Sequence, residues 1–224
     1  MATTKVVDII NRASIILQDT SHVRFPQAEL LTFFNDAQRE VVMQRPDAKT
    51  VNTTLTCVAG SKQTIPTAAL RLLDVVRNTN GRAVTQVDRK LLDEQLPNWH
   101  ETTAGSNKIE HFIYDAADPK HFYVYPQATT AHSLEIIYSE SPADISVSNF
   151  ATDTTVISVD DVYGNSLLDY VLHRAYQKDS EYAGNQQKAM MHYQSFANSL
   201  GIKTQADMAT TPLPANPDSN AGRL

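Results

Sequence analysis

The sequence has little cysteine, little glycine and no long apolar run. Cys57 is the single cysteine, which excludes an internal disulfide and a zinc site built from several thiolates. The longest apolar stretches, such as residues 15–17 and 41–43, are far shorter than the roughly 20 residues that span a bilayer. Near the N-terminus, Asp8 and Arg12 interrupt any apolar core of a secretory signal. We therefore expect a protein of the cytosol that has no membrane partner.

Positive charge is also scarce. The chain has 19 Lys and Arg against 25 Asp and Glu, which gives a formal net charge of -6 at pH 7. A surface that binds phosphates generally needs clustered positive charge, and the sequence has no polybasic run. This balance argues against a general nucleic-acid-binding surface.

Catalytic motifs are missing as well. The sequence has no His-x-x-x-His, no Glu-x-x-His and no glycine-rich phosphate loop. Asp160 and Asp161 precede a helical segment, where carboxylates are favourable without a metal. His111 and His121 fit a surface pair on a hairpin, and residues 164–166 fit close helix packing better than a nucleophile turn. The sequence thus predicts no enzyme activity and no catalytic, metal or cofactor-binding residue.

Helical periodicity is present at the start of the chain. Thr3 or Thr4 can cap a first helix, and Pro26 suits the first turn of a second one that should stop near Arg45, before Pro46. The apolar positions at three- and four-residue spacing are Val6, Ile9, Ile10, Ala13, Ile16 and Leu17, then Leu30, Phe33, Phe34, Ala37, Val41 and Val42. This pattern predicts an antiparallel helical hairpin.

The same periodicity returns near the end. Residues 158–161 resemble a capping box, in which Ser158 accepts from the backbone and Asp161 reaches back, before a third helix over residues 162–176. A fourth helix is predicted over residues 182–200, with Gly201 as its C-cap. Residues 204–224 contain three prolines and almost no large apolar side chain, so we expect an extended or disordered arm.

Between the helical regions the hydrophobic period changes to two. We predict hairpins from residues 51–57 with 63–66, from 70–78 with 82–87 across an Asn-Gly turn, and from 111–114 with 122–125, followed by a strand at 134–138. A short helix over residues 88–96 is capped by Asp88, and Trp99 after it should anchor packing. The middle is expected to be a small antiparallel sheet system.

The fold class expected from this order is α+β. It comprises an antiparallel four-helix bundle, formed by the N- and C-terminal helix pairs, with an inserted antiparallel β domain and an extended C-terminal tail. The expected divisions are residues 1–48 for the first hairpin, 49–156 for the β domain, 157–203 for the second hairpin and 204–224 for the arm.

Stretches in the helical and β regions together carry a family pattern. They are residues 6–13 (VVDIINRA), Phe25-Pro26, 29–31 (ELL), 34–40 (FNDAQRE), 70–75 (LRLLDV), 123–126 (YVYP), 169–176 (DYVLHRAY) and 179–183 (DSEYA). These stretches resemble the head-to-tail adaptor, or connector, proteins of tailed bacteriophages. The resemblance covers about residues 3–203.

The resemblance implies a structural virion protein at the head-tail junction, assembled in the host cytoplasm. It implies a homo-oligomeric ring of twelve copies between the portal protein and the tail nozzle or tube, with genomic DNA passing through the channel without sequence-specific binding. The residues expected at the subunit or portal interface are Tyr182, Tyr193, Phe196, Pro212, Pro214 and Leu224.

Two alternatives stay open at this point. One is a different virion component, such as a tail terminator or fibre connector. The other is a metal-dependent hydrolase or nuclease that uses Asp160, Asp161 and a histidine.

Overall fold

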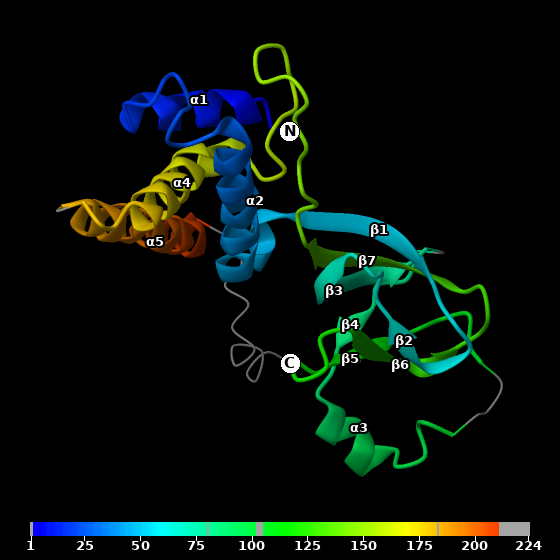
Figure 1. Cartoon of the computed structure of the whole chain (residues 1–224). Coiled ribbons are helices and arrows are strands. Elements are labelled where there is room, and N and C mark those ends of the chain that lie inside the picture. The colour runs from blue at the N-terminus through cyan, green and yellow to red at the C-terminus, as the bar shows by residue number, and fades with distance from the viewer. Residues whose placement is uncertain (1, 80, 102–104, 183, 211–224) are drawn as a thin grey trace. The chain divides into compact units, whose positions relative to one another are not determined.

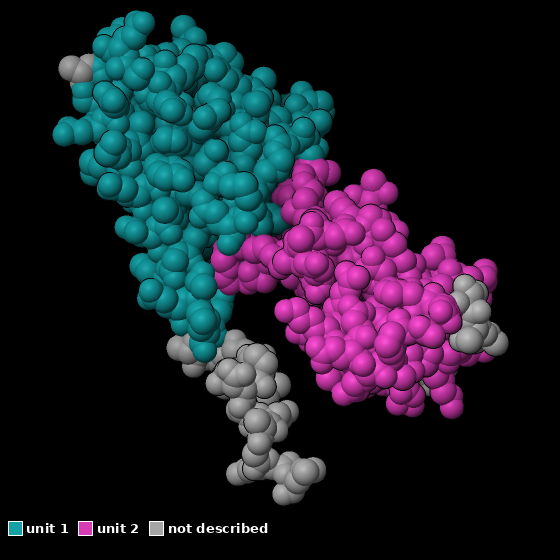
Figure 2. All heavy atoms as spheres, turned by 90° about the horizontal axis from the view of Figure 1, so that it is seen from below, with its two compact units in different colours: residues 1–44, 144–224 teal, residues 45–143 magenta. Residues whose placement is uncertain are grey.

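The computed structural model describes residues 2–79, 81–101, 105–182 and 184–210. The chain divides into two compact units, which Figure 2 shows in different colours. We call residues 1–44 and 144–224 the helical unit and residues 45–143 the β unit.

The helical unit contains four α-helices and a short 3-10 turn within its described residues (Figure 1). They are α1 (Val6–Ile16), α2 (Gln27–Gln44), η2 (Asp161–Tyr163), α4 (Gly164–Lys178) and α5 (Asn185–Thr210). Helix α4 is the centre of the unit, because α1, α2 and α5 each pack against it. The fully buried side chains include Ile9, Ile10, Leu30, Phe34, Leu167, Leu172 and Phe196.

Two prolines set the bounds of α2, as the sequence predicts. The Pro26 carbonyl accepts the amides of Glu29 and Leu30 at 2.9 and 3.1 Å, so the helix begins directly after it. At the other end α2 stops at Gln44, and Pro46 opens the 3-10 turn η1 (Pro46–Ala48) of the β unit.

The β unit contains two sheets. Its strands are β1 (Thr50–Thr56), β2 (Gly60–Thr64), β3 (Ala69–Asn78), β4 (Thr85–Gln86), β5 (His111–Tyr114), β6 (His121–Ala128) and β7 (Ser133–Glu140), with α3 (Arg89–Gln95) between β4 and β5. One sheet has the order β1-β7-β3 and is antiparallel, and the other has the order β2-β6-β5-β4. Side chains of both sheets, among them Leu72, Val75, Phe122, Val124, Leu134 and Ile136, form one apolar core.

The expected fold class, a four-helix bundle with an inserted antiparallel β domain, is wrong. The described residues form five α-helices and two separate sheets, and the second sheet is mixed because β4 runs parallel to β5. Helix α5 packs chiefly on α4. Helical periodicity predicts that a segment is a helix, but it does not say how many neighbours that helix packs against.

The expected hairpin of residues 51–57 with 63–66 is also wrong. Strand β1 pairs with β7 and β2 pairs with β6, because a corner between β1 and β2 takes the chain from one sheet to the other. The buried Gln63 side chain closes this corner through bonds to the Val58 amide, the Val58 carbonyl and the Gly60 carbonyl at 2.9, 2.9 and 3.0 Å. The expected hairpin of residues 70–78 with 82–87 is confirmed next to its turn, where the Asn78 amide donates to the Arg82 carbonyl at 2.7 Å and Arg77 bridges Ala83. Beyond that point β4 pairs with β5 instead. The hairpin of β5 and β6 is confirmed.

Helix ends differ from expectation at Gly201 and Asp161. Helix α5 continues through Gly201 to Thr210, so residues 204–210 are helical rather than extended. The Asp161 carboxylate does not reach back to Ser158 but accepts the amides of Thr3 and Thr4 at 2.8 to 2.9 Å. It therefore ties the N-terminal segment to the turn before α4, and α1 starts with Lys5 as N-cap, without a side-chain cap. Asp88 caps α3 as predicted, through the Lys90 amide at 2.9 Å.

Candidate interaction surfaces

Aromatic and polar contacts hold α5 on α4. The Phe196 ring is fully buried and lies 5.2 Å from the ring of Tyr170, edge to face. Ser166 and Ser199 share a hydrogen bond of 2.7 Å between the two helices. The Asp169 carboxylate contacts the His192 ring nitrogen Nδ1 at 2.9 Å. These contacts fix the two helices as one rigid hairpin, which we call the α4–α5 hairpin.

Apolar side chains of α5 lie on more than one side of the helix. Met190 is 59% exposed and the next residue, Met191, is 65% exposed. Consecutive residues of an α-helix point about 100° apart, so both cannot face the same neighbour. Further along, Ile202 and Met208 are 67% and 78% exposed. The hairpin thus leaves large apolar side chains in solvent on two sides.

Each of these sides carries a groove of its own. The first, which we call the Tyr193 groove, has a volume of about 480 Å³ and is lined by His173, Gln177, Ser180, Gln186, Ala189, Met190 and Tyr193. The second, the His192 groove, has a volume of about 330 Å³ and is lined by Asp169, Lys188, Met191, His192, Gln194, Ser195 and Asn198. A methionine therefore borders each groove, and methionine adapts well to irregular partner surfaces.

The interface residues expected from the sequence fall in different environments. Tyr182 is 62% exposed and the Arg24 guanidinium lies over its ring at 4.5 Å. Tyr193 is exposed and lines its groove, whereas Phe196 is buried inside the protomer and offers no surface. Pro212, Pro214 and Leu224 lie outside the described residues.

The residues that the sequence offered for an enzyme site make contacts within the fold. Backbone amides, the amide of Thr4 first, lower the pKa of Asp161, so its carboxylate is held ionised by the N-terminal segment. In the β5–β6 register His111 faces Tyr125, and His121 contacts Asp118, so the hairpin does not bring the two histidines together. Within the described ranges, no three His, Cys, Asp or Glu side chains gather as a metal site would require.

The Gly164-Asn165-Ser166 stretch serves helix packing. Ser166 is buried and hydrogen-bonded to Ser199, and the nearest atom to a Cβ at Gly164 would be the Thr4 methyl at 4.0 Å.

No described helix is both long enough and apolar enough to cross a membrane.

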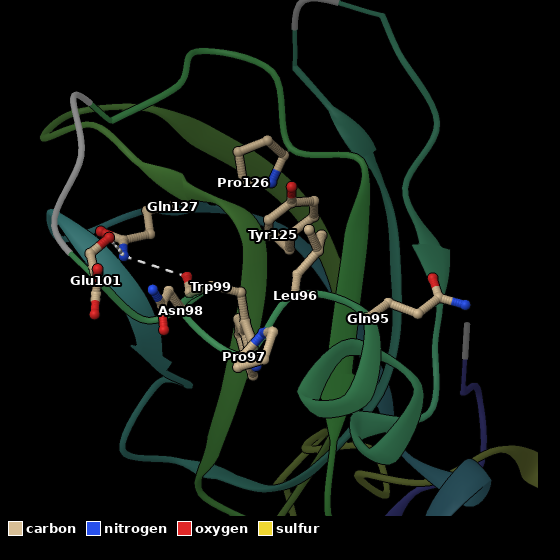
Figure 3. A pocket seen from close by; sticks show the side chains of 9 residues that line it. All are labelled: Gln95, Leu96, Pro97, Asn98, Trp99, Glu101, Tyr125, Pro126 and Gln127. Carbon is tan, nitrogen blue, oxygen red and sulfur yellow. Dashed lines mark hydrogen bonds between the residues drawn. The ribbon is translucent and has the colours of Figure 1, made fainter.

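The β unit has a further cleft, which sequence reasoning missed (Figure 3). It has a volume of about 450 Å³ and is lined by Gln95, Leu96, Pro97, Asn98, Trp99, Glu101, Tyr125, Pro126 and Gln127. One wall comes from the end of α3 and the residues after it, and the other comes from the end of β6. These walls are almost thirty residues apart in the sequence, so no local sequence pattern predicts the cleft. The sequence signal that could have pointed to the cleft was the presence of Trp99, Tyr125 and Pro126.

The fold and these surfaces define a class of protein: a two-unit α+β protein with grooves on the α4–α5 hairpin and a cleft in the β unit. The family model described as SU10 adaptor protein matches residues 4–217, and the chain belongs to this family. The resemblance to phage head-to-tail adaptors is thereby confirmed. A search of curated proteins gave no match.

Family membership gives the broad function. The family is one of bacteriophage structural adaptors, so the chain is a structural protein of the virion that associates with other virion components.

Proposed function

We propose that the protein forms a dodecameric ring at the head-tail junction, between the portal and the tail tube or nozzle, and lines the DNA channel. The observation that carries this proposal is the pair of different grooves on the α4–α5 hairpin, each bordered by an exposed methionine. In the ring, the Tyr193 groove side of one copy packs against the His192 groove side of the next.

Two unlike surfaces on one protomer support a head-to-tail contact rather than a two-fold dimer. A two-fold contact uses the same patch twice, whereas a head-to-tail contact uses two patches and closes into a ring when the rotation allows. Large exposed apolar areas on a soluble protomer mark such contacts. Burial of Met190 on one side and Met191 on the other would remove both from water in every copy.

The charge distribution supports a channel wall. Residues 1–44 and 144–224 contain nine Lys and Arg but fourteen Asp and Glu, so the helical unit holds most of the negative balance. A wall that repels phosphate lets a duplex pass without sticking to it. In this proposal residues 1–48 and 157–203 form the ring body, residues 49–156 reach the tail component, and the C-terminal segment with Pro212, Pro214 and Leu224 contacts the portal or a neighbouring copy.

The test uses two charge substitutions, one on each side of the hairpin. Met190→Glu and Met191→Glu should each prevent the protein from forming a ring when it is mixed with isolated portals, because a buried carboxylate opposes the apolar contact. Negative-stain electron microscopy measures ring formation. Met43→Glu is the matched control, since Met43 is 67% exposed but lies on α2. It should leave ring formation intact.

Mixing the two defective variants sharpens the test. Each variant keeps one intact side, so a head-to-tail contact predicts dimers of one Met190→Glu copy with one Met191→Glu copy, and no rings. Ring formation by either single variant would contradict the proposed contact. An equal loss with Met43→Glu would show that the effect does not come from the hairpin surfaces.

A further inference from the structure

We propose that the cleft of the β unit is a binding site for a proline-containing peptide, and that residues 211–217 of a neighbouring copy occupy it. The identity of the peptide as a segment of a neighbouring copy rests on the proposed ring. The site itself is argued from its lining residues and from the sequence that follows α5.

The floor of the cleft is preformed. Trp99 is 4% exposed and belongs to a small core with Leu92 and Ile113. Its indole Nε1 donates to the Asp93 carboxylate at 2.8 Å, and its ring lies 3.6 Å from the ring of His100. The buried Gln127 amide donates to the carbonyls of Trp99 and Glu101 and so joins the two walls. Little ordering is left to be done when a ligand binds.

The cleft above this floor is lined by both apolar and polar residues (Figure 3). Leu96, Pro97, Tyr125 and Pro126 supply apolar and aromatic surface, and Leu96 is 43% exposed. Asn98 and Tyr125 also line the cleft, and the Asn98 amide and the Tyr125 hydroxyl are groups that can donate hydrogen bonds. Proline-rich segments bind such aromatic-lined grooves, because their backbone is already extended and their carbonyls need donors.

The sequence after α5 has the matching chemistry. Residues 211–217 read Thr-Pro-Leu-Pro-Ala-Asn-Pro, with a leucine between two prolines. The two prolines fix the backbone angle φ and lack an amide proton, which favours an extended segment with free carbonyls. Leu213 would enter the cleft beside Leu96 and Tyr125.

Helix α5 continues beyond Leu200, which lies in the core of the helical unit. Leu200 is buried, and none of the described side chains at 201–208 is buried. The helix nevertheless continues to Thr210, two residues before Pro212. A helix of 26 residues is about 39 Å long. The proline segment follows the end of this helix in the sequence, and in the proposal a neighbouring copy binds it there.

The test uses Trp99, the only tryptophan of the chain, as a fluorescent reporter inside the cleft. A synthetic peptide of residues 210–220 is titrated into the full-length protein. We expect a saturable change in Trp99 emission, and no such change with a peptide in which both Pro212 and Pro214 are Ser. Emission that does not respond to the native peptide, or responds equally to both, would overturn the assignment.

Two leucine variants localise the effect. Leu96→Glu should weaken peptide binding roughly tenfold or more, because a carboxylate replaces apolar contact surface. Leu91→Glu is the matched control: Leu91 is 46% exposed and also belongs to the α3 region, but it does not line the cleft. Far-UV circular dichroism checks that both variants fold. Equal weakening by both variants would refute the site.

The source of the peptide is tested with the full-length double variant Pro212→Ser, Pro214→Ser. If a neighbouring copy supplies the segment, the Trp99 emission of this variant should differ from wild type only as protein concentration rises. A difference at every concentration would mean that the chain fills its own cleft, and the proposal would be wrong. Peptide binding that persists while no ring forms on portals would refute the proposed ring and leave the cleft assignment intact.

Discussion

Replacement of Asn78 by leucine should strongly lower the free energy of unfolding of the β unit, although the two side chains are similar in size. Asn78 is fully buried at the end of β3. Its side-chain amide donates to the carbonyls of Arg82 and Ile109 at 2.9 and 2.8 Å. Its side-chain oxygen accepts the Ile109 amide and contacts the His132 ring nitrogen Nε2, both at 2.8 Å. One side chain thus joins three separate segments of the unit.

The magnitude follows from the groups left without a partner. In Asn78→Leu the Ile109 amide, the Ile109 carbonyl and the His132 Nε2 lose their partner in a buried place. Each of these three groups costs about 1–3 kcal/mol, which gives a loss of about 3–9 kcal/mol in the free energy of unfolding. A domain is typically stable by about 5–15 kcal/mol, so the variant should be marginal.

Urea denaturation followed by Trp99 fluorescence measures this loss in the β unit itself, because the single tryptophan lies there. Asn52→Leu is the control: Asn52 is exposed on β1 and its side-chain amide donates to the Glu135 carboxylate at 3.0 Å, so its change should stay within about 0.5 kcal/mol. A loss below about 1 kcal/mol for Asn78→Leu would refute the reasoning.

Three further outcomes are expected. Gly201→Ala should raise stability by up to about 1 kcal/mol in thermal melts, because a Cβ there meets no atom within 4 Å and glycine is a poor helix former; a lower melting temperature would contradict this. Burial lowers the pKa of His132, so the unfolded chain binds its proton more readily and stability should fall as pH drops below about 6.5; urea midpoints at several pH values test this, and His132→Gln should flatten the slope. Asp161→Asn should lower the melting temperature at pH 7, where the wild-type carboxylate is ionised. The difference should narrow below about pH 4, because the unfolded wild-type chain then takes up a proton more readily than the folded carboxylate, whose pKa is lowered.

Local signals in the sequence predicted local structure well. Pro26 and Pro46 mark the bounds of α2 because proline lacks an amide proton and restricts the residue before it. Asp88 caps α3 because an aspartate before a helical run accepts a free amide. The strands of the β5–β6 hairpin, residues 111–114 and 121–128, were also close to expectation.

Long-range pairing was not readable from the sequence. The alternation in residues 51–57 predicts a strand, but it does not say that β7 rather than β2 is the partner. Gly201 looked like a helix end, yet α5 passes through it because the exposed face of a helix tolerates glycine. Asp161 looked like part of a capping box, and its actual partners, Thr3 and Thr4, are more than 150 residues away in the sequence.

The candidate surfaces were predictable only in part. Tyr182 and Tyr193 were expected at a surface and are exposed, whereas Phe196 shares their spacing but faces α4. Periodicity places an aromatic residue on a helix face, and only packing decides whether that face is covered. The cleft around Leu96 and Tyr125 depends on α3 lying beside the end of β6, which no local pattern encodes.

Electron microscopy of the protein mixed with portal rings from the same virion tests the ring most directly, with the protein alone as the comparison. The proposal predicts a ring of twelve copies stacked on the portal, with the α4–α5 hairpins in contact between neighbours. Absence of any association with the portal, or a stacked assembly in which these hairpins do not touch, would contradict it.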